Sequence, residues 1–516
     1  MQNSNTKKVF NNITFSILSQ VITISLGIVI PRMFLVSFGS EMNGLLTSVG
    51  QLYTYMVLLE AGVGTVTLQA LYKPVAENDY SSLNSVLSAT NHYYKKIGTI
   101  YLILIFVLAF GYPLVLDTSI SFWTVSAIVF LNGITGAISF FVTAKYNLLL
   151  QAEGKNYILT NVSLIIHIAI SVSKIILIAV GVNILVIQAM YAILNTAQIV
   201  YITLYIRKNY KWLDLSAKPN FSAISQRGSA FILQISELVF RNTDVLILTF
   251  TKSCGLKVVS VYTMYQMLYG MIQTAINTFS TGIYFVLGQT FNTDREKYIK
   301  YHDMYEVFHM AITFSLYTVA YLFIAPFLKL YTQGVSDITY IDKWLPFLFV
   351  ATFFLSVGRG ASANVLNFAR HFKKTQWRSV LEASINIAVS IPCAYFFGIY
   401  GVLFGTIAAL IYRTNDMIIY ANHKILNRSC LPTYKRWIVN FIVFIVIDRA
   451  SKFITLDLSN YFNIILWAAV ACIVIVPIYF IVAAVTNYKV YLNAKDMILD
   501  IISKKRRIKN TKTESF

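Results

Sequence analysis

Apolar segments of about 20 residues recur along almost the whole chain, and they constrain its fold more than any other feature. A helix of about 20 apolar residues can cross a hydrocarbon core about 30 Å thick. The sequence predicts fourteen such helices, at 13–36, 45–71, 97–116, 122–149, 158–180, 184–206, 230–250, 258–286, 307–330, 344–368, 380–397, 401–420, 434–447 and 462–485. The thirteenth has a short apolar part, because Asp448, Arg449 and Lys452 follow it.

The overall composition agrees with a chain that crosses a membrane many times. Hydrophobic residues make up 57% of the 516 residues and charged residues 12%, whereas soluble domains have about 25% charged residues. This is more apolar surface than a water-soluble core of that size could bury. The sequence therefore predicts an all-α integral membrane protein.

The cysteines and glycines give no sign of a cofactor site. Cys254, Cys393, Cys430 and Cys472 are scattered, without the spacings typical of disulfide frameworks or metal sites. The sequence has no phosphate-binding-loop motif, so we do not expect this chain to hydrolyse ATP. We expect no cofactor, no metal ion and no enzyme activity.

The distribution of the 42 lysines and arginines predicts the orientation. If the N-terminus is cytoplasmic, most of them fall in cytoplasmic loops, such as 207–227 and 370–378, and in the tail with its basic run at 504–507. Cytoplasmic loops of membrane proteins carry an excess of Lys and Arg. The net charge of +20 therefore reflects topology and attraction to anionic membrane lipids, and we expect no nucleic-acid partner.

The chain also looks duplicated, with an offset of about 217 residues. The aligned pairs include Ala152 with Ala369, Ser173 with Ser390, Gly181 with Gly398, and Ala192 with Ala409. Repeated halves are common in secondary transporters. We predict an N-terminal six-helix lobe at 1–206, a cytoplasmic linker at 207–228, a C-terminal six-helix lobe at 229–425, two extra helices within 426–486 and a basic cytoplasmic tail at 487–516. The stretches 79–96 and 291–303 should then be equivalent cytoplasmic connections.

Polar residues inside the predicted spans recur at helical spacing. Three stripes stand out: Ser163, His167, Ser171 and Lys174; Gln234, Glu237, Arg241 and Asp244; and Tyr262, Gln266, Tyr269, Gln273 and Asn277. So many polar faces cannot all meet lipid, so they either form hydrogen bonds between helices or line a hydrated cavity. Hydrogen bonding between helices is enough to explain the neutral residues, but not the lone charges.

Four basic residues, Lys174, Arg241, Arg359 and Arg413, lie well inside apolar segments. A cation at the centre of a spanning helix costs roughly 2.5–3.5 kcal/mol on insertion scales. Two of the four have acids within one helical turn and can pair locally: Arg241 with Glu237 or Asp244, and Arg413 with Asp416. Lys174 can either extend to the membrane surface or face a cavity.

Arg359 has no acid within one turn and is flanked by Gly358 and Gly360. We expect its guanidinium to be unpaired and to face a water-filled cavity. The alternative is a long-range pair with Glu60, which also lacks a local partner. His167 is either a hydrogen-bonded core histidine or a proton relay.

Two segments carry a resemblance to a known family. The stretch 30–87, which begins IPRMFLVSFGSEMNGLL, and the stretch 241–267, RNTDVLILTFTKSCGLKVVSVYTMYQM, resemble Wzx-type polysaccharide flippases of bacteria. These belong to the MOP superfamily, with the lipid II flippase MurJ and the MATE antiporters. The resemblance covers essentially the whole chain.

The resemblance implies a MATE/MurJ-like transporter with two six-helix lobes, two C-terminal helices and a V-shaped central cavity. Such a protein moves an undecaprenyl-pyrophosphate-linked oligosaccharide across the bacterial cytoplasmic (inner) membrane for cell-surface polysaccharide synthesis, alongside polysaccharide polymerase machinery. An arginine near the end of the family's first helix corresponds to Arg32. The expected substrate-binding residues are Arg32, Lys174, Arg241, Arg359, Arg413, Gln266, Gln273 and Asn277, and the expected ion-coupling residues are Glu60 and Asp244.

The physical chemistry of the stripes agrees with this function. Guanidinium groups bind pyrophosphate through paired hydrogen bonds, while Tyr, Gln and Asn side chains can hold sugars. A MATE-like ion-coupled drug or cation exporter shares the architecture but should leave an acid uncompensated. A membrane glycosyltransferase or polymerase would need a long loop or an interfacial carboxylate motif that we do not find, and a structural scaffold would need no intramembrane charge.

We predict that both termini lie in the cytoplasm, because the basic loops then alternate strictly. A membrane-impermeant thiol reagent added to intact cells should label Cys254 and miss Cys430, and both should react after permeabilisation. Labelling of Cys430 rather than Cys254 would overturn this topology.

Overall fold

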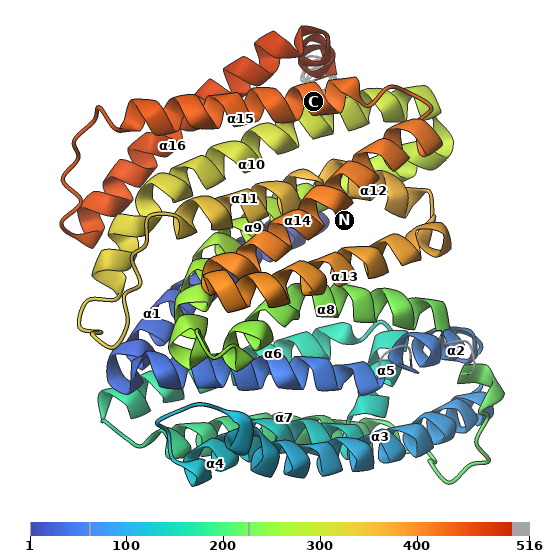
Figure 1. The fold of residues 1–516 in the computed structure, drawn as a ribbon. Coiled ribbons are helices and arrows are strands. Elements are labelled where there is room, and N and C mark those ends of the chain that lie inside the picture. The colour runs from blue at the N-terminus through green and yellow to red at the C-terminus, as the bar shows by residue number, and fades with distance from the viewer. Residues whose placement is uncertain (1, 61–62, 225–227, 498–516) are drawn as a thin grey trace. The chain divides into compact units, whose positions relative to one another are not determined.

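The computed structural model describes residues 2–60, 63–224 and 228–497, so part of the predicted basic tail lies outside the described residues. Every regular element in these ranges is a helix (Figure 1). Nine of these helices are long and apolar enough to cross a membrane, or ten if Leu26–Glu60 and Val63–Glu77 form one bent span. The predicted all-α membrane fold is confirmed, while the count of fourteen spans stays a prediction.

The chain forms two compact units. The first comprises residues up to Thr263 together with Gly334–Thr339 and Ile391–Val402, and the second comprises Met264–Gln333, Tyr340–Ser390 and the residues from Leu403. Up to the start of α9 the elements are α1 (Gln2–Met56), η1 (Val57–Glu60), α2 (Val63–Glu77), α3 (Tyr80–Val115), α4 (Phe122–Val142), α5 (Ala144–Ala152), α6 (Asn156–Ala179), α7 (Ile184–Asn209), η2 (Ser222–Ile224) and α8 (Gly228–Phe250). The predicted lobe boundaries stay predictions.

The remaining elements begin with α9 (Gly255–Thr293), which starts in the first unit and continues in the second. They are followed by α10 (Arg295–Tyr331), α11 (Leu345–Gly358), α12 (Gly360–Phe368), α13 (Phe372–Phe397), α14 (Ile399–Ile419), the π-helical η3 (Tyr420–Ile425), α15 (Leu431–Ser451) and α16 (Tyr461–Thr486). The first two predicted spans are not separated by a loop, because α1 continues through a kink at Gly39, whose φ of 79° favours glycine.

The order of elements repeats with an offset of about 216 residues. The long helices α3 and α10 have 36 and 37 residues, and each starts after an aspartate N-cap, Asp79 or Asp294, which accepts a backbone hydrogen bond at 3.0 Å. Glycines with positive φ recur as the pairs Gly39 with Gly255 and Gly181 with Gly398. The stretches 79–96 and 291–303 each include the start of one of these long helices, and their role as equivalent cytoplasmic connections stays a prediction.

In the first unit, α3 packs along α4, and α4 and α6 pack along α7. Their buried side chains include Leu87, Tyr94 and Ile105 of α3 and Val125 and Ile128 of α4. The beginning of α9 approaches α1 so closely that a Cβ on Gly44 would lie 1.9 Å from the carbonyl oxygen of Leu256. Glycine is therefore required at this contact.

The predicted linker, 207–228, begins as part of the first unit. Trp212 packs against Tyr80 with ring centroids 4.6 Å apart, and its carbonyl oxygen accepts a hydrogen bond from Asn84 at 3.1 Å. The backbone N–H of Asn220 donates to Ser85 at 3.1 Å. These contacts attach the described part of the linker to the start of α3.

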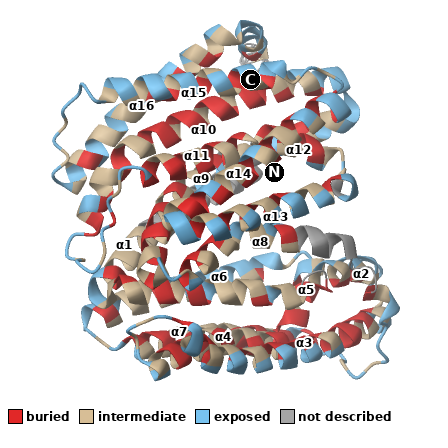
Figure 2. Ribbon diagram, viewed as in Figure 1, coloured by how far each residue is buried: buried red, intermediate tan, exposed pale blue. Residues whose placement is uncertain are grey.

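In the second unit, α10 packs against α11, α15 and α16, and buried residues run along its length (Figure 2). Tyr298, Phe314, Tyr317 and Leu328 are fully buried on α10. The two C-terminal helices therefore bury part of their surface against α10 and are an integral part of this unit.

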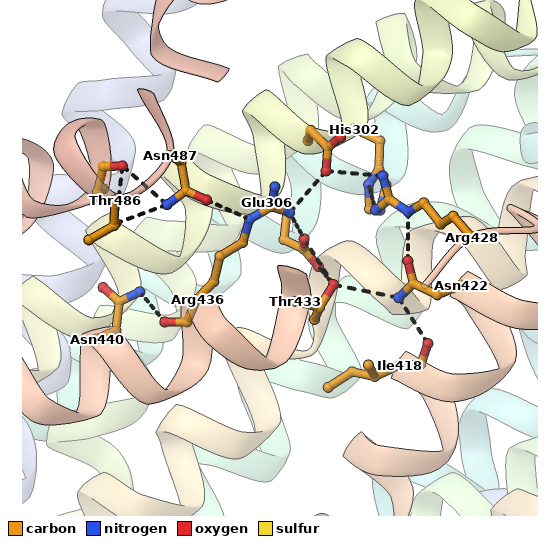
Figure 3. Close-up of polar contacts among 12 residues, drawn as sticks. His302, Glu306, Ile418, Asn422, Arg428, Thr433, Arg436, Asn440, Thr486 and Asn487 are labelled. Atoms are coloured by element: carbon orange, nitrogen blue, oxygen red, sulfur yellow. Dashed lines mark hydrogen bonds and ion pairs between the residues drawn. The ribbon is translucent and has the colours of Figure 1, made fainter. Parts of the chain in front are cut away.

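Polar contacts attach α15 to one end of α10 (Figure 3). Arg436 of α15 donates to Asp303 at 2.9 Å and also contacts Glu306, and the side chains of Arg436 and Glu306 are only 4% and 2% exposed. The hydroxyl of Thr433 donates to Glu306 at 3.0 Å, and Arg428 pairs with Asp303 at 3.0 Å. Two acids and two arginines thus compensate each other.

The same cluster contains three side chains of the kind that bind metal ions. Atoms of His302, Asp303 and Glu306 that could bind a metal lie within 4.8 Å of one another. However, Arg428 lies 3.2 Å from Nδ1 of His302, and Arg436 pairs with both acids. The guanidinium groups already supply the positive charge that a metal ion would bring.

We predict that Arg436→Ala destabilises the protein by about 3–5 kcal/mol, because it leaves Glu306 buried without its cation. The measurement is the midpoint of thermal unfolding of the detergent-solubilised protein. Lys73→Ala is the control, since Lys73 and Glu77 form an exposed pair at 3.9 Å that should contribute little. Equal midpoints for the two variants would contradict a stabilising role of the Arg436 pair.

Candidate functional site

The predicted span 344–368 is broken in the middle, at Arg359. This residue lies between α11 and α12 and caps both, so its side chain projects from a one-residue break, although α11 and α12 together form one candidate span. Both neighbouring glycines are covered: a Cβ on Gly358 would lie 2.7 Å from the Trp437 ring, and one on Gly360 would lie 3.0 Å from Nε2 of His309. The glycines therefore allow other helices to approach, and do not leave the helix bare as the sequence suggested.

Arg359 is paired, which corrects the prediction of a lone cation. Its Nη1 lies 2.7 Å from Oε1 of Glu382 on α13, and the two side chains are 16% and 8% exposed. The alternative partner, Glu60, instead accepts a hydrogen bond from Tyr94 at 2.5 Å. The pairing with Glu382 joins residues 23 positions apart on different helices, which helical spacing cannot reveal.

Glu382 belongs to a larger group that we call the arginine cluster: Arg359, Arg378, Glu382, Arg413 and Asp416. Arg413 pairs with Asp416 at 2.8 Å, as predicted, and its Nε lies 3.4 Å from Glu382. Arg378 also contacts Asp416. Three guanidinium groups thus share two carboxylates, and the cluster carries one excess positive charge.

The arginine cluster has hydrogen-bonding capacity to spare. A guanidinium offers five N–H donors, and Nε of Arg378 is buried without a hydrogen-bond partner among the described residues. The Arg378 guanidinium also lies 4.6 Å from the Tyr420 ring centroid, a contact that holds it without neutralising it. Excess positive charge and unused donors in one place favour an anionic ligand.

Sequence reasoning missed Arg378 and Glu382 as members of this site. They begin a stripe at every fourth position of α13 that continues with Asn386 and Ser390, and all four are buried or half-buried. Asn386 donates to Thr406 of α14 at 3.0 Å. The stripe could have been found, but the predicted span began at Val380 and so excluded its first member.

The first unit contains a pocket of about 470 Å³, the Glu60 pocket, between η1, α2 and α8. Its charged lining residues are Glu60, Glu237 and Arg241. Arg241 pairs with Glu237 at 3.1 Å, as predicted, and both side chains are more than 60% exposed. Asp244, the other predicted partner of Arg241, is buried and accepts a hydrogen bond from Tyr262 at 2.8 Å.

A second pocket in the first unit, of about 450 Å³, lies between α1, α6 and α7, and we call it the Lys174 pocket. The stripe predicted in the fifth span lines it with all four members, Ser163, His167, Ser171 and Lys174. Helix α7 adds polar residues that the sequence analysis did not single out: Tyr191, Asn195 and Gln198. Nζ of Lys174 lies 5.2 Å from the Tyr191 ring centroid, and no acidic residue is among the described lining residues.

The other predicted site residues are more scattered. Arg32 is half-buried on α1, next to Pro31 of the Lys174 pocket. On α9, Gln266 and Asn277 are exposed and Gln273 is half-buried. Two tyrosines of the same predicted stripe are buried instead: Tyr262 donates to Asp244, and Tyr269 donates to the carbonyl oxygen of Pro346 at 3.0 Å. Substrate binding by Arg32, Gln266, Gln273 and Asn277 stays a prediction.

No protein-family model matches the sequence, and no curated protein matches it. Several solved structures are similar in fold. The lipid II flippase MurJ in an inward closed conformation has a TM-score of 0.63 at 14% identity, with 93% of this chain and 100% of MurJ covered. An inward-facing MATE multidrug transporter of the MOP superfamily has a TM-score of 0.58 at 15% identity, with 77% of this chain and 94% of that chain covered.

A third structure, the MATE multidrug transporter DinF-BH in complex with a ligand, has a TM-score of 0.54 at 13% identity and covers 82% of this chain and 97% of its own. All three are transporters or flippases, and at these identities the likeness concerns the fold. The chain is therefore a multi-pass membrane protein with the helical fold of MATE transporters and MurJ.

Proposed function

We propose that this protein is a flippase that moves an undecaprenyl-pyrophosphate-linked oligosaccharide across the cytoplasmic membrane of a bacterium for cell-surface polysaccharide synthesis. Its termini lie in the cytoplasm, and polysaccharide polymerase machinery uses the flipped substrate. The observation that carries this proposal is the arginine cluster, in which three buried or half-buried guanidinium groups face two carboxylates.

The cost of burying charge supports an anionic substrate. Removing an arginine from water is expensive, and a neutral ion pair would be the least costly way to keep one in a membrane helix. The cluster instead keeps an excess cation. A pyrophosphate carries concentrated negative charge and accepts paired hydrogen bonds from guanidinium groups, so it would compensate this charge when bound.

The extent of the structural match also supports a flippase over a drug exporter. MurJ matches 93% of this chain, whereas the two MATE transporters described above match 77% and 82%. The additional matched length is as expected if α15 and α16 have counterparts in MurJ. A lipid-linked substrate, which MurJ is named for, is therefore the favoured class here.

The Lys174 pocket offers groups suited to the sugars. His167, Asn195 and Gln198 carry hydrogen-bonding groups, and Lys174 adds a cation for which no acidic partner is found among the described residues. Its volume of about 450 Å³ lies within the range of about 300–1,000 Å³ typical of small-molecule sites. Considered by itself, this pocket is suited to the hydroxyl groups of a sugar, and the arginine cluster, considered by itself, is suited to a pyrophosphate.

The second candidate function, an ion-coupled exporter of drugs or cations, is favoured by the Glu60 pocket. Two acids and one arginine are among its lining residues, so these residues carry one excess negative charge, whereas the arginine cluster carries one excess positive charge. Transport of a cationic dye by the reconstituted protein would favour this function, particularly if a polyprenyl pyrophosphate did not compete.

Two substitutions that break the same ion pair distinguish anion binding from a structural role. Arg359→Ala removes the excess charge of the cluster, whereas Glu382→Gln increases it. We expect Arg359→Ala to weaken the binding of a fluorescent polyprenyl pyrophosphate by about 10- to 100-fold, the effect of losing a charged hydrogen-bonding partner. Glu382→Gln should bind at least as tightly as the wild type. Binding is measured on the full-length protein in lipid nanodiscs, with polyprenyl monophosphate for comparison.

Stability is the matched control, because both variants break a largely buried pair and both should lower the unfolding midpoint. Comparable losses of binding in the two variants would mean that the pair is only structural, and would count against the proposal. Because Arg359 is paired with Glu382, Arg359→Ala should reduce both stability and transport.

We propose Glu60 as the ion-coupling residue. It lines a pocket and accepts a hydrogen bond from Tyr94, whereas Asp244 is buried against Tyr262 and is less accessible. Glu60→Gln should leave polyprenyl pyrophosphate binding unchanged but remove the dependence of flipping in proteoliposomes on an imposed ion gradient. Asp244→Asn is the comparison, and a gradient dependence that survives in Glu60→Gln would exclude Glu60.

A further inference from the structure

The break at Arg359 is covered on one side by a buried histidine of α10. Nε2 of His309 lies 3.0 Å from the carbonyl oxygen of Val357, two residues before Arg359. A carbonyl oxygen can only accept, so Nε2 carries the proton and donates it. Gly360 makes this contact possible, because any Cβ there would lie 3.0 Å from the same nitrogen.

The remaining contacts of His309 fix the direction of its ring. The ring stacks on Tyr305, one helical turn earlier, with centroids 5.0 Å apart and an angle of 21° between the planes. Its Nδ1 lies 3.4 Å from the hydroxyl of Ser280 on α9. The imidazole is thus held between α9, α10 and the broken helix, and its direction leaves Nε2 pointing at Val357.

On the opposite side of the break, Gly358 is covered by the ring of Trp437 from α15. Arg359 lies between the two covered glycines. The direction of its side chain depends on the backbone at positions 358–360, and this backbone is contacted by one aromatic ring on each side. Of these two rings, the histidine also forms a hydrogen bond with the main chain, at Val357.

We propose that His309 is a positioning residue for Arg359. By donating to Val357, it fixes the backbone of the break and thereby directs the Arg359 guanidinium toward Glu382 and a bound pyrophosphate. This inference rests on the proposed function, since it assigns His309 an effect on the same anion site. His309 itself does not touch the substrate.

Four variants test this role on the full-length protein in lipid nanodiscs. His309→Phe keeps a ring for stacking but removes the N–H donor. Gly360→Ala keeps the histidine but places a Cβ against its Nε2, which should move this nitrogen away from the carbonyl oxygen of Val357. Each should weaken polyprenyl pyrophosphate binding by about tenfold. Ser280→Ala, which removes the longer contact of His309 and a hydrogen bond within α9 to Ile276, should bind like the wild type. His309→Gln, which can still donate an N–H, should recover part of the affinity.

A double-mutant cycle separates positioning from general destabilisation. If His309 acts through Arg359, His309→Phe should have no further effect on binding in an Arg359→Ala background. An equal loss with and without Arg359, or wild-type binding by both His309→Phe and Gly360→Ala, would overturn the proposal.

Hydrogen exchange without any ligand distinguishes failure of this inference from failure of the proposed function. His309→Phe should increase amide exchange in peptides that cover residues 355–363, and leave peptides of α4 unchanged. If the wild type binds no polyprenyl pyrophosphate, the proposed function fails, whereas unchanged exchange at the break would refute the role of His309.

Discussion

Hydrocarbon offers no hydrogen-bonding partners, and most features of this structure are responses to that constraint. Backbone groups must be satisfied within each segment, so the described spans are helices. Side-chain charges must find compensation inside the protein or face water. A helix break is tolerated only where other groups supply the missing contacts, and at Arg359 the neighbouring helices do so through His309 and Trp437.

Two charged groups of the second unit satisfy this constraint differently. Around Arg436, two acids and two arginines balance, and hydroxyl and amide groups occupy further hydrogen-bonding positions. Such a group is suited to holding α15 against α10. Around Arg359 the balance is incomplete, with three arginines for two acids. The charges of the first arrangement balance without a ligand, whereas the second has an excess positive charge that a bound anion would compensate. This difference in charge separates a structural cluster from a candidate binding site.

The sequence was informative wherever the relevant spacing was local. Hydrophobic runs predicted the helices, and the three- and four-residue spacings predicted the pairs of Arg413 with Asp416 and Arg241 with Glu237. The stripe from Ser163 to Lys174 indeed lines one pocket. Pairs between helices could not be predicted, because tertiary packing decides which helices become neighbours.

The partners of Glu60 and Arg359 illustrate this limit. Tyr94 and Glu382 lie 34 and 23 residues away along the chain, and no periodicity connects them to the residues they contact. The glycines beside Arg359 were a genuine signal, but small residues can mean either an empty surface or a close neighbour. Only the positions of His309 and Trp437 decide between these meanings.

The repeated order of elements adds a final step, because the two halves share a framework but not their charges. At the offset of 217 residues that pairs Ser173 with Ser390, Arg378 and Glu382 correspond to Asn161 and Ile165, and Lys174 corresponds to Ile391. The polar residues that would bind a substrate therefore do not follow the repeat. The repeat therefore accounts for the backbone framework of each unit, while the substitutions that distinguish the halves account for the arginine cluster in the second unit and the Lys174 pocket in the first.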